Sequence, residues 1–191
     1  LRDNESVLLE AYRLIATAAG AGSAITPAAE WLLDNYHLVE EQIREIRADL
    51  PAGYYRQLPK LAGGPFAGYP QVFSVAWAFV AHTDSRLDAE TLRRFVSAYQ
   101  RVQPLTMGEL WALTIALRIV LVENLRRLSL SIVRGRAARQ EADALADALF
   151  GLRRGGEERA LPVEPVATLL RPFEGGPLMT AFAVQLVQRL R

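Results

Sequence analysis

Two histidines with nearby carboxylates are the first candidates for acid–base catalysis or metal binding in this chain. His82 lies two residues before Asp84 in the stretch AFVAHTDSR. A carboxylate can orient an imidazole for acid–base catalysis, but residues two apart in a helix point about 200° away from each other. The pair therefore favours a structural hydrogen-bond network at a helix end, with a catalytic or sugar-binding role as the alternative.

The second histidine and the paired acidic residues do not form a metal site or a catalytic site either. His37 and Glu41 share a helical face, but a protein zinc site needs at least three ligands from the chain. Glu157 and Glu158 are neighbours in sequence, whereas glycoside hydrolysis requires carboxylates that oppose each other across a cleft. We therefore predict no metal and no catalytic residue in this chain.

A corner rich in tyrosine is the best candidate for a docking surface. Two prolines, Pro51 and Pro59, frame its first part, and glycine-containing turns follow. The alternative is a packed connector whose tyrosines only keep their hydroxyl groups in water. The candidate docking residues are Tyr54, Tyr55, Arg56, Lys60 and Tyr69.

A run of arginines with no acidic residue between Glu123 and Glu141 forms a second candidate surface. It could face anionic lipid or an acidic partner domain, or it could be the solvated side of a long helix. Its members are Arg126, Arg127, Arg134, Arg136 and Arg139. Arg118 differs because it interrupts an apolar run, so we expect it to form a structural ion pair.

The amino-acid composition limits the functional classes to which this chain can belong. The chain has 191 residues, is 51% hydrophobic and carries a formal charge of +1, which is typical of a folded domain and argues against a nucleic-acid partner. Without cysteine it has no disulfide or thiolate site. The longest apolar run, 110–122, is shorter than the ~20 residues of a membrane-spanning helix. Because it begins at Leu1, we expect a piece of a larger protein.

The apolar residues repeat at helical spacing, and capping residues mark where the helices begin. A capping box is expected at Thr106 and Glu109, at the start of the longest helix. The segment from Gly20 to Gly22 should end the first helix, and the second should run to about Leu50. The predicted starts are Asn4, Thr26, the neighbourhood of Pro70, Asp88 and Thr106.

These signals predict an all-α fold: a bundle of about seven to nine helices around a central apolar helix from Leu110 to Ile132. Gly135 is expected to interrupt this helix, with an alanine-rich helix after it. Two final helices are predicted at Glu164–Leu170 and Leu178–Leu190. We expect a helical core domain at 1–150 and a C-terminal helical appendage at 151–191.

Three segments carry a resemblance to a known family. They run from Thr26 to Pro59, from Ala78 to Asp88 and from Gln100 to Leu128, and include the long motifs WLLDNYHLVEEQI and QPLTMGELWAL. Together they resemble the N-terminal soluble region of bacterial cyclic β-1,2-glucan synthases, which are membrane glycosyltransferases that use UDP-glucose and have a region similar to glycoside phosphorylases.

The resemblance implies a location and a role. It places the chain on the cytoplasmic side of the bacterial inner membrane, before the membrane helices, with the other domains of the same polypeptide as partners. UDP-glucose and a divalent metal would then belong to the parent enzyme, and no cofactor to this segment. The implied role is non-catalytic, in assembly, docking or regulation. The alternative is an independent carbohydrate-active enzyme or sugar-binding module that uses His82 and Asp84.

Overall fold

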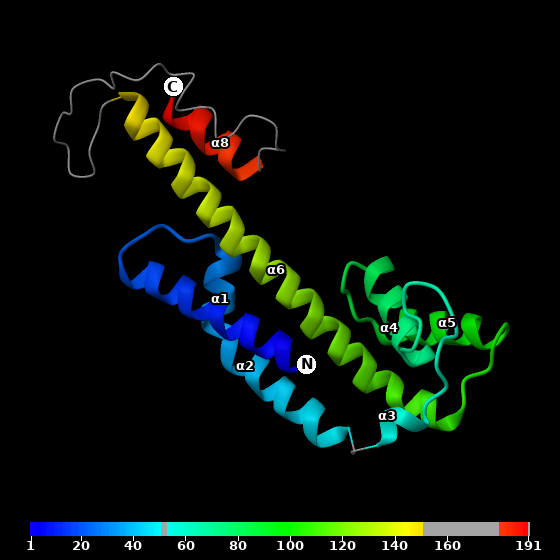
Figure 1. Cartoon of the computed structure of the whole chain (residues 1–191). Coiled ribbons are helices and arrows are strands. Elements are labelled where there is room, and N and C mark those ends of the chain that lie inside the picture. Colours follow the sequence, from blue (N-terminus) through cyan, green and yellow to red (C-terminus); the bar gives the residue numbers. More distant parts are fainter. Residues whose placement is uncertain (51–52, 151–179, 191) are drawn as a thin grey trace. The chain divides into compact units, whose positions relative to one another are not determined.

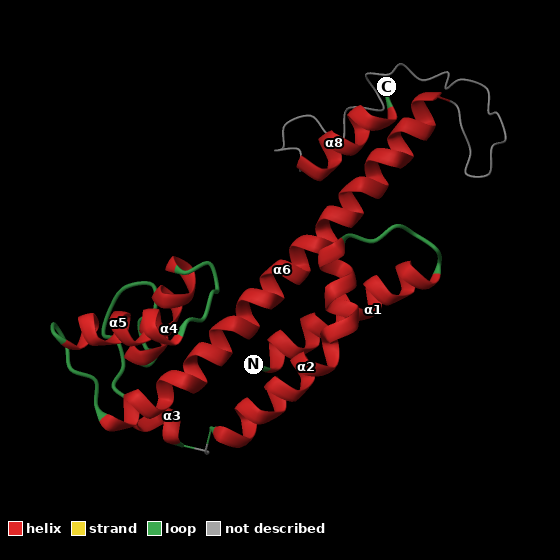
Figure 2. Ribbon diagram, turned by 180° about the vertical axis from the view of Figure 1, so that it is seen from behind, coloured by secondary structure: helices red, strands yellow, loops and turns green. Residues whose placement is uncertain are grey.

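The computed structural model describes residues 1–50, 53–150 and 180–190, which form helices joined by loops (Figures 1 and 2). These residues contain no strand, only an isolated bridge between Lys60 and Pro70. The predicted all-α fold is confirmed. The part of the chain that the structure describes holds seven helices: α1 (Arg2–Gly20), α2 (Pro27–Asp49), α3 (Tyr54–Gln57), α4 (Gln71–His82), α5 (Ala89–Gln100), α6 (Met107–Phe150) and α8 (Thr180–Arg189).

The first two helices form a hairpin whose ends follow the capping signals. After α1, the amide of Ser23 donates to the carbonyl of Ala18 and that of Gly22 to Ala19, with Gly22 in the left-handed region at φ 69°. This is a Schellman motif. The Thr26 hydroxyl accepts from the Ala29 amide and begins α2 as predicted. The two helices then pack together.

One predicted cap is wrong. Asn4 does not begin the first helix: α1 already starts at Arg2, and Asn4 is a buried residue inside it. Its side chain hydrogen-bonds to the carboxylate of Glu123 on α6 instead. The physical reason is that a burial site and a long-range polar partner are available to Asn4, whereas the local pattern shows only its capping propensity.

The main core lies between α4, α5 and the first half of α6. Helix α4 is apolar nearly all round, as expected, and buries Phe79 to 1% exposure against Phe95 of α5, with ring centroids 5.5 Å apart. Helix α6 contributes small and branched side chains, so the helices can approach closely. The buried residues that form the centre of this core include Val72, Val75, Ala76, Phe79, Val80, Val96, Ala112, Leu113, Ala116, Leu117 and Val120.

The capping box at the start of α6 is confirmed. The amide of Glu109 donates to the Thr106 hydroxyl at 3.2 Å, and the amide of Thr106 donates to the Glu109 carboxylate at 2.9 Å. Asp88 caps α5 in the same way, accepting from the Thr91 amide at 2.7 Å. In each case the two partners lie three residues apart, so the local sequence is enough to predict them.

The predicted interruption at Gly135 is wrong, because α6 continues without a break to Phe150. A glycine inside a helix costs only about 1 kcal/mol relative to alanine, which favourable neighbours such as Arg136 and Ala137 can offset. A Cβ atom added at Gly135 would lie 3.9 Å from the Cβ of Ala181 on α8 and 3.8 Å from Nη1 of Arg139. These are ordinary contacts, so glycine is not required here by lack of space.

We therefore expect Gly135→Ala to stabilise the protein by about 0.5–1 kcal/mol, because alanine has the higher helix propensity and no clash opposes it. Urea denaturation followed by circular dichroism measures the change. The matched control is Gly22→Ala: Gly22 has φ 69°, where a side chain is strained, so this substitution should destabilise. A loss of stability in Gly135→Ala would mean that α8 packs more closely than the structure shows.

The chain divides into two compact units, Leu1–Ser129 and Leu130–Arg191, and α6 supplies residues to both. In the second unit Phe182 of α8 packs on a strip of α6 formed by Ala138, Ala142 and Leu145. Helix α8 confirms the last predicted helix. The predicted helix Glu164–Leu170 lies outside the described residues, and the division at residue 150 stays a prediction.

Candidate docking surface

The tyrosine corner begins at α3, where neighbouring tyrosines take different roles. Gly53 has φ 92° and allows the turn that starts this short helix. The hydroxyl of Tyr54 donates to the carbonyl of Gly108 at 2.6 Å, and its ring meets that of Trp111 edge-on at 5.5 Å. Tyr54 is therefore half-buried and joins α3 to the start of α6, which is a structural role.

Tyr55, Lys60 and Tyr69 form an exposed group. The ammonium of Lys60 lies 5.6 Å from the centre of the Tyr55 ring, and Tyr55 and Tyr69 are 39% and 48% exposed. Partial burial, and to a lesser extent Tyr69, raise the pKa of Tyr55 above its usual value. Arg56 is also exposed. Backbone hydrogen bonds close the loop between Pro59 and Gln71 and hold Lys60 and Tyr69 in place.

An aromatic cluster continues from Tyr69 along α4, and sequence reasoning did not identify it. Tyr69 stacks on Phe73 at 5.3 Å, Phe66 contacts both Phe73 and Trp77, and the guanidinium of Arg127 lies 5.9 Å from the centre of the Trp77 ring. The signal was present in the spacing, because positions 69, 73 and 77 are four residues apart and share a face at the start of a helix.

Helix α4 ends at His82, two residues before Asp84. The structure does not bring these two residues together as an acid–base pair. His82 is the exposed last residue of the helix, while Asp84 and Ser85 adopt left-handed conformations at φ 50° and 65°. The backbone amide of Ser85 donates to the carbonyl of Val80, and the side-chain amide of Asn124 donates to the Ser85 hydroxyl at 2.7 Å. This geometry is a helix C-terminal cap bound to α6.

Beside this cap lies a small hollow of about 170 Å³. Its polar lining comes from Asp84, Ser85, Asn124 and Arg127, and Trp77 supplies an aromatic wall. His82 does not line it. No group of three histidine, cysteine or acidic residues that could hold a metal ion occurs in the described residues.

The arginines that were singled out from the sequence lie in different surroundings. Arg118 binds Asp49 at 3.0 Å and Glu45 at 3.6 Å, which ties α6 to the end of α2, and its side chain is 35% exposed. Arg126 binds Glu123 at 2.8 Å, and this hydrogen bond is the main reason that the pKa of Glu123 is lowered. Arg127 lies over Trp77.

The remaining members of the arginine run, Arg134, Arg136 and Arg139, belong to the second unit. Two of the five arginines therefore already contact other side chains of the first unit, and the run is not a single free surface. Whether any of these residues docks a partner stays a prediction.

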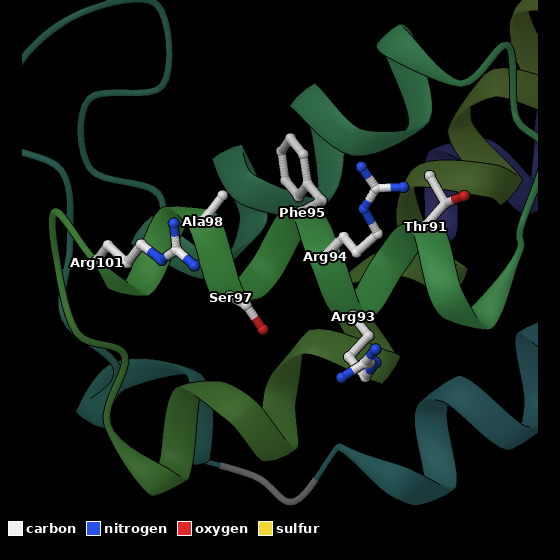
Figure 3. Close-up of a pocket in the computed structure, with 7 residues that line it drawn as sticks. All are labelled: Thr91, Arg93, Arg94, Phe95, Ser97, Ala98 and Arg101. Carbon is white, nitrogen blue, oxygen red and sulfur yellow. The ribbon is translucent and has the colours of Figure 1, made fainter.

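A different arginine face, on α5, was not identified from the sequence. It surrounds a shallow hollow of about 780 Å³, and the side chains of Arg94 and Arg101 lie along it (Figure 3). Arg93 is bound to Glu90 at 2.8 Å. The missed signal is that residues 91–108 contain three arginines and no acidic residue. Polar and aromatic lining comes from Thr91, Phe95 and Ser97.

No family model matches the chain. A search of known proteins finds the cyclic beta-(1,2)-glucan synthase NdvB of Rhizobium meliloti (strain 1021), which is 42% identical over 190 residues. The chain is homologous to a segment of that synthase. The match covers the whole chain but only 6% of the synthase, so the chain corresponds to a small part of a much larger polypeptide. The resemblance indicated by the three sequence segments is thereby confirmed.

The extent of the match shows how the chain relates to the synthase. The 42% identity extends along the whole chain, so the sequence from α1 to α8 has a counterpart in the synthase. The described helices include none that is both long and apolar enough to cross a bilayer. The large size of the relative implies further domains beside this segment.

Proposed function

We propose that the chain is a non-catalytic helical domain of a cyclic β-1,2-glucan synthase that acts in assembly, docking or regulation of the catalytic parts. The observation that carries this proposal is the match of the full chain to a small part of the synthase. Synthesis from UDP-glucose, and any divalent metal, would belong to the remaining parts of the polypeptide. The domain would lie on the cytoplasmic side of the inner membrane.

The exposed group of Tyr55, Lys60 and Tyr69 supports a docking role. Exposed aromatic rings beside a cation are common in protein interfaces, because they bury much apolar area at a small entropic cost and still offer polar contacts. Backbone hydrogen bonds close the loop that carries Lys60 and Tyr69, and Tyr55 lies on α3, so little ordering is needed on binding. We propose that this group contacts another domain of the same polypeptide.

A chimera tests the role. The matching segment of the Rhizobium meliloti synthase is deleted, or replaced by this chain, and the amount and ring size of the glucan are measured together with protein abundance. We expect the deletion to reduce glucan formation at least tenfold and the chimera to restore it. Within the chimera, Tyr55→Ser with Tyr69→Ser should lower output at unchanged abundance, because the docking rings are lost.

The matched control is Leu14→Ser with Leu87→Ser, which removes two exposed apolar side chains elsewhere and should leave output unchanged. Normal abundance, ring size and output after deletion of the whole segment would contradict the proposal. An effect of the control equal to that of the tyrosine variant would contradict the docking surface, though not the role of the domain.

A second candidate function is sugar binding at the hollow beside Asp84. Its size of about 170 Å³, its aromatic wall at Trp77 and the polar groups of Asp84 and Asn124 are suited to one sugar ring. Titration of the chain with glucose and β-glucan oligosaccharides in a calorimeter tests it. Binding that disappears in Asp84→Gly would support this function, since glycine keeps the left-handed backbone and removes only the carboxylate.

A further inference from the structure

The three most exposed large hydrophobic side chains in the described residues lie within ten positions of one another. They are Val102, Met107 and Trp111, at 89%, 82% and 62% exposure, and they follow α5 and begin α6. The other large hydrophobic residues that are exposed reach at most 55%. Clustering of such side chains at one place on an otherwise packed unit marks an interaction site.

The backbone that carries these side chains is held firmly. Between Val102 and Met107, Leu105 is buried at 7% exposure. The Gln103 backbone amide donates to the carbonyl of Tyr99 at 3.0 Å, and its side-chain amide donates to the side-chain oxygen of Gln71 at 2.8 Å. Beside Trp111, the Tyr54 hydroxyl binds the carbonyl of Gly108. The apolar side chains therefore project from an ordered backbone, so their exposure is not the result of a flexible loop.

The arginine face of α5 adjoins this apolar group directly, since Arg101 precedes Val102. Arg94 and Arg101 are seven residues apart, two turns along one side of the helix, and both are exposed on the outer side of α5 (Figure 3). Neither forms a salt bridge with any residue that the structure describes. The nearest acids in sequence are occupied: Glu90 binds Arg93, and Glu109 is buried in the capping box.

We propose that this corner, comprising Arg94, Arg101, Val102, Met107 and Trp111, binds the surface of an anionic lipid bilayer. The arginines face lipid phosphates, and the apolar side chains enter the boundary between headgroups and acyl chains. A positive face beside projecting aliphatic and tryptophan side chains is the combination that interfacial binding requires. The proposal goes beyond the role in the synthase and does not depend on it.

The shape of the corner favours lipid over a protein partner. Val102, Met107 and Trp111 project from a loop and from the first turns of a helix, with 62–89% of each residue exposed. A protein would need a matching depression to cover them, whereas a fluid bilayer adapts to separate projections. The unpaired arginines complement its negative surface charge.

Co-sedimentation of the full chain with vesicles tests the proposal. Vesicles of phosphatidylcholine with about 30% phosphatidylglycerol have a strongly negative surface and should bind the chain. Vesicles of pure phosphatidylcholine should not. Binding should weaken as salt rises. Arg94→Gln with Arg101→Gln should lower the partition coefficient about fivefold for each arginine. Val102→Ser with Met107→Ser should lower it about tenfold, because the apolar contact is lost.

Matched variants separate this corner from general charge or hydrophobicity. Arg134→Gln with Arg136→Gln removes the same charge from the other arginine run, and Leu14→Ser removes an exposed apolar side chain from α1. Both should bind like the original chain. Brominated lipid should quench part of the tryptophan fluorescence, and that part should disappear in Trp111→Phe.

Two results would overturn the proposal. One is the absence of salt-sensitive binding to anionic vesicles. The other is binding that survives the corner variants but is lost in Arg134→Gln with Arg136→Gln. Tight binding of an acidic polypeptide such as polyglutamate without vesicle binding would identify the face as a protein site and would equally reject lipid. None of these results bears on glucan formation by the chimera, so the two proposals can fail separately.

Discussion

Phe79→Ala is expected to destabilise the first unit by about 3–5 kcal/mol, the usual cost of removing a buried aromatic ring. The side chain is 1% exposed, lies on α4 and packs edge-on against Phe95 of α5. Around it are branched residues of α4 and α6 that cannot collapse fully into the space left by the ring. Because a domain has only about 5–15 kcal/mol of stability, the loss should be visible as a large drop in the urea midpoint.

The control for this variant is Val102→Ala, at a position that is 89% exposed. It should change stability by less than about 0.5 kcal/mol, as for most surface positions. Circular dichroism at increasing urea measures both. A loss below about 1 kcal/mol in Phe79→Ala would mean that α4 and α5 do not close on α6 as the structure shows, and would also remove the support assigned to the α5–α6 corner.

Phe182→Ala is expected to release α8 from α6 within the second unit, at a cost of about 3 kcal/mol in local stability. Phe182 is 4% exposed and packs on the strip formed by Ala138, Ala142 and Leu145. A helix as short as α8 is marginal alone in water, so its order depends on this packing. Its polar contacts, such as Gln185 to Asp143 at 2.7 Å, each contribute only about 1 kcal/mol net and so do not replace the ring.

Hydrogen exchange resolved by mass spectrometry measures this effect. Protection should fall in the peptides that cover 180–189 and 138–149, while those from α4 and the first turns of α6 keep theirs, since opening can be local. Val184→Ala, at a position that is 52% exposed, is the matched control and should leave protection unchanged. Uniform loss of protection across the chain in Phe182→Ala would contradict the division into two units.

The helix boundaries were largely predictable because their determinants are local. Thr26, Asp88 and Thr106 each bind a backbone amide three residues ahead, so both partners stand in the same short stretch of sequence. The two wrong predictions, the cap at Asn4 and the break at Gly135, concern positions where the local signal did not decide the outcome. Asn4 found a partner on α6, and Gly135 stayed helical because neither its propensity nor its surroundings were sufficient to end the helix.

The candidate surface was less predictable, because residue type does not show which way a side chain points. Tyr54 and Tyr55 are neighbours of the same type, yet one is bound to Gly108 and the other is exposed beside Lys60. The arginine run had the stronger charge pattern in sequence, but Arg126 and Arg127 contact Glu123 and Trp77. On the α5 face, Arg93 binds Glu90, whereas Arg94 and Arg101 form no salt bridge with a residue that the structure describes.

By itself, the sequence determined the helical class, most helix ends and the relation to a cyclic β-(1,2)-glucan synthase, since capping and periodicity act over a few residues and long motifs are specific. Only the tertiary structure decided which polar groups are paired and which apolar side chains are left in water. Arg118 meets Asp49 across 69 residues of chain, and Val102 remains exposed while Leu105 beside it is buried. Such outcomes depend on how helices pack, and local patterns do not contain that information.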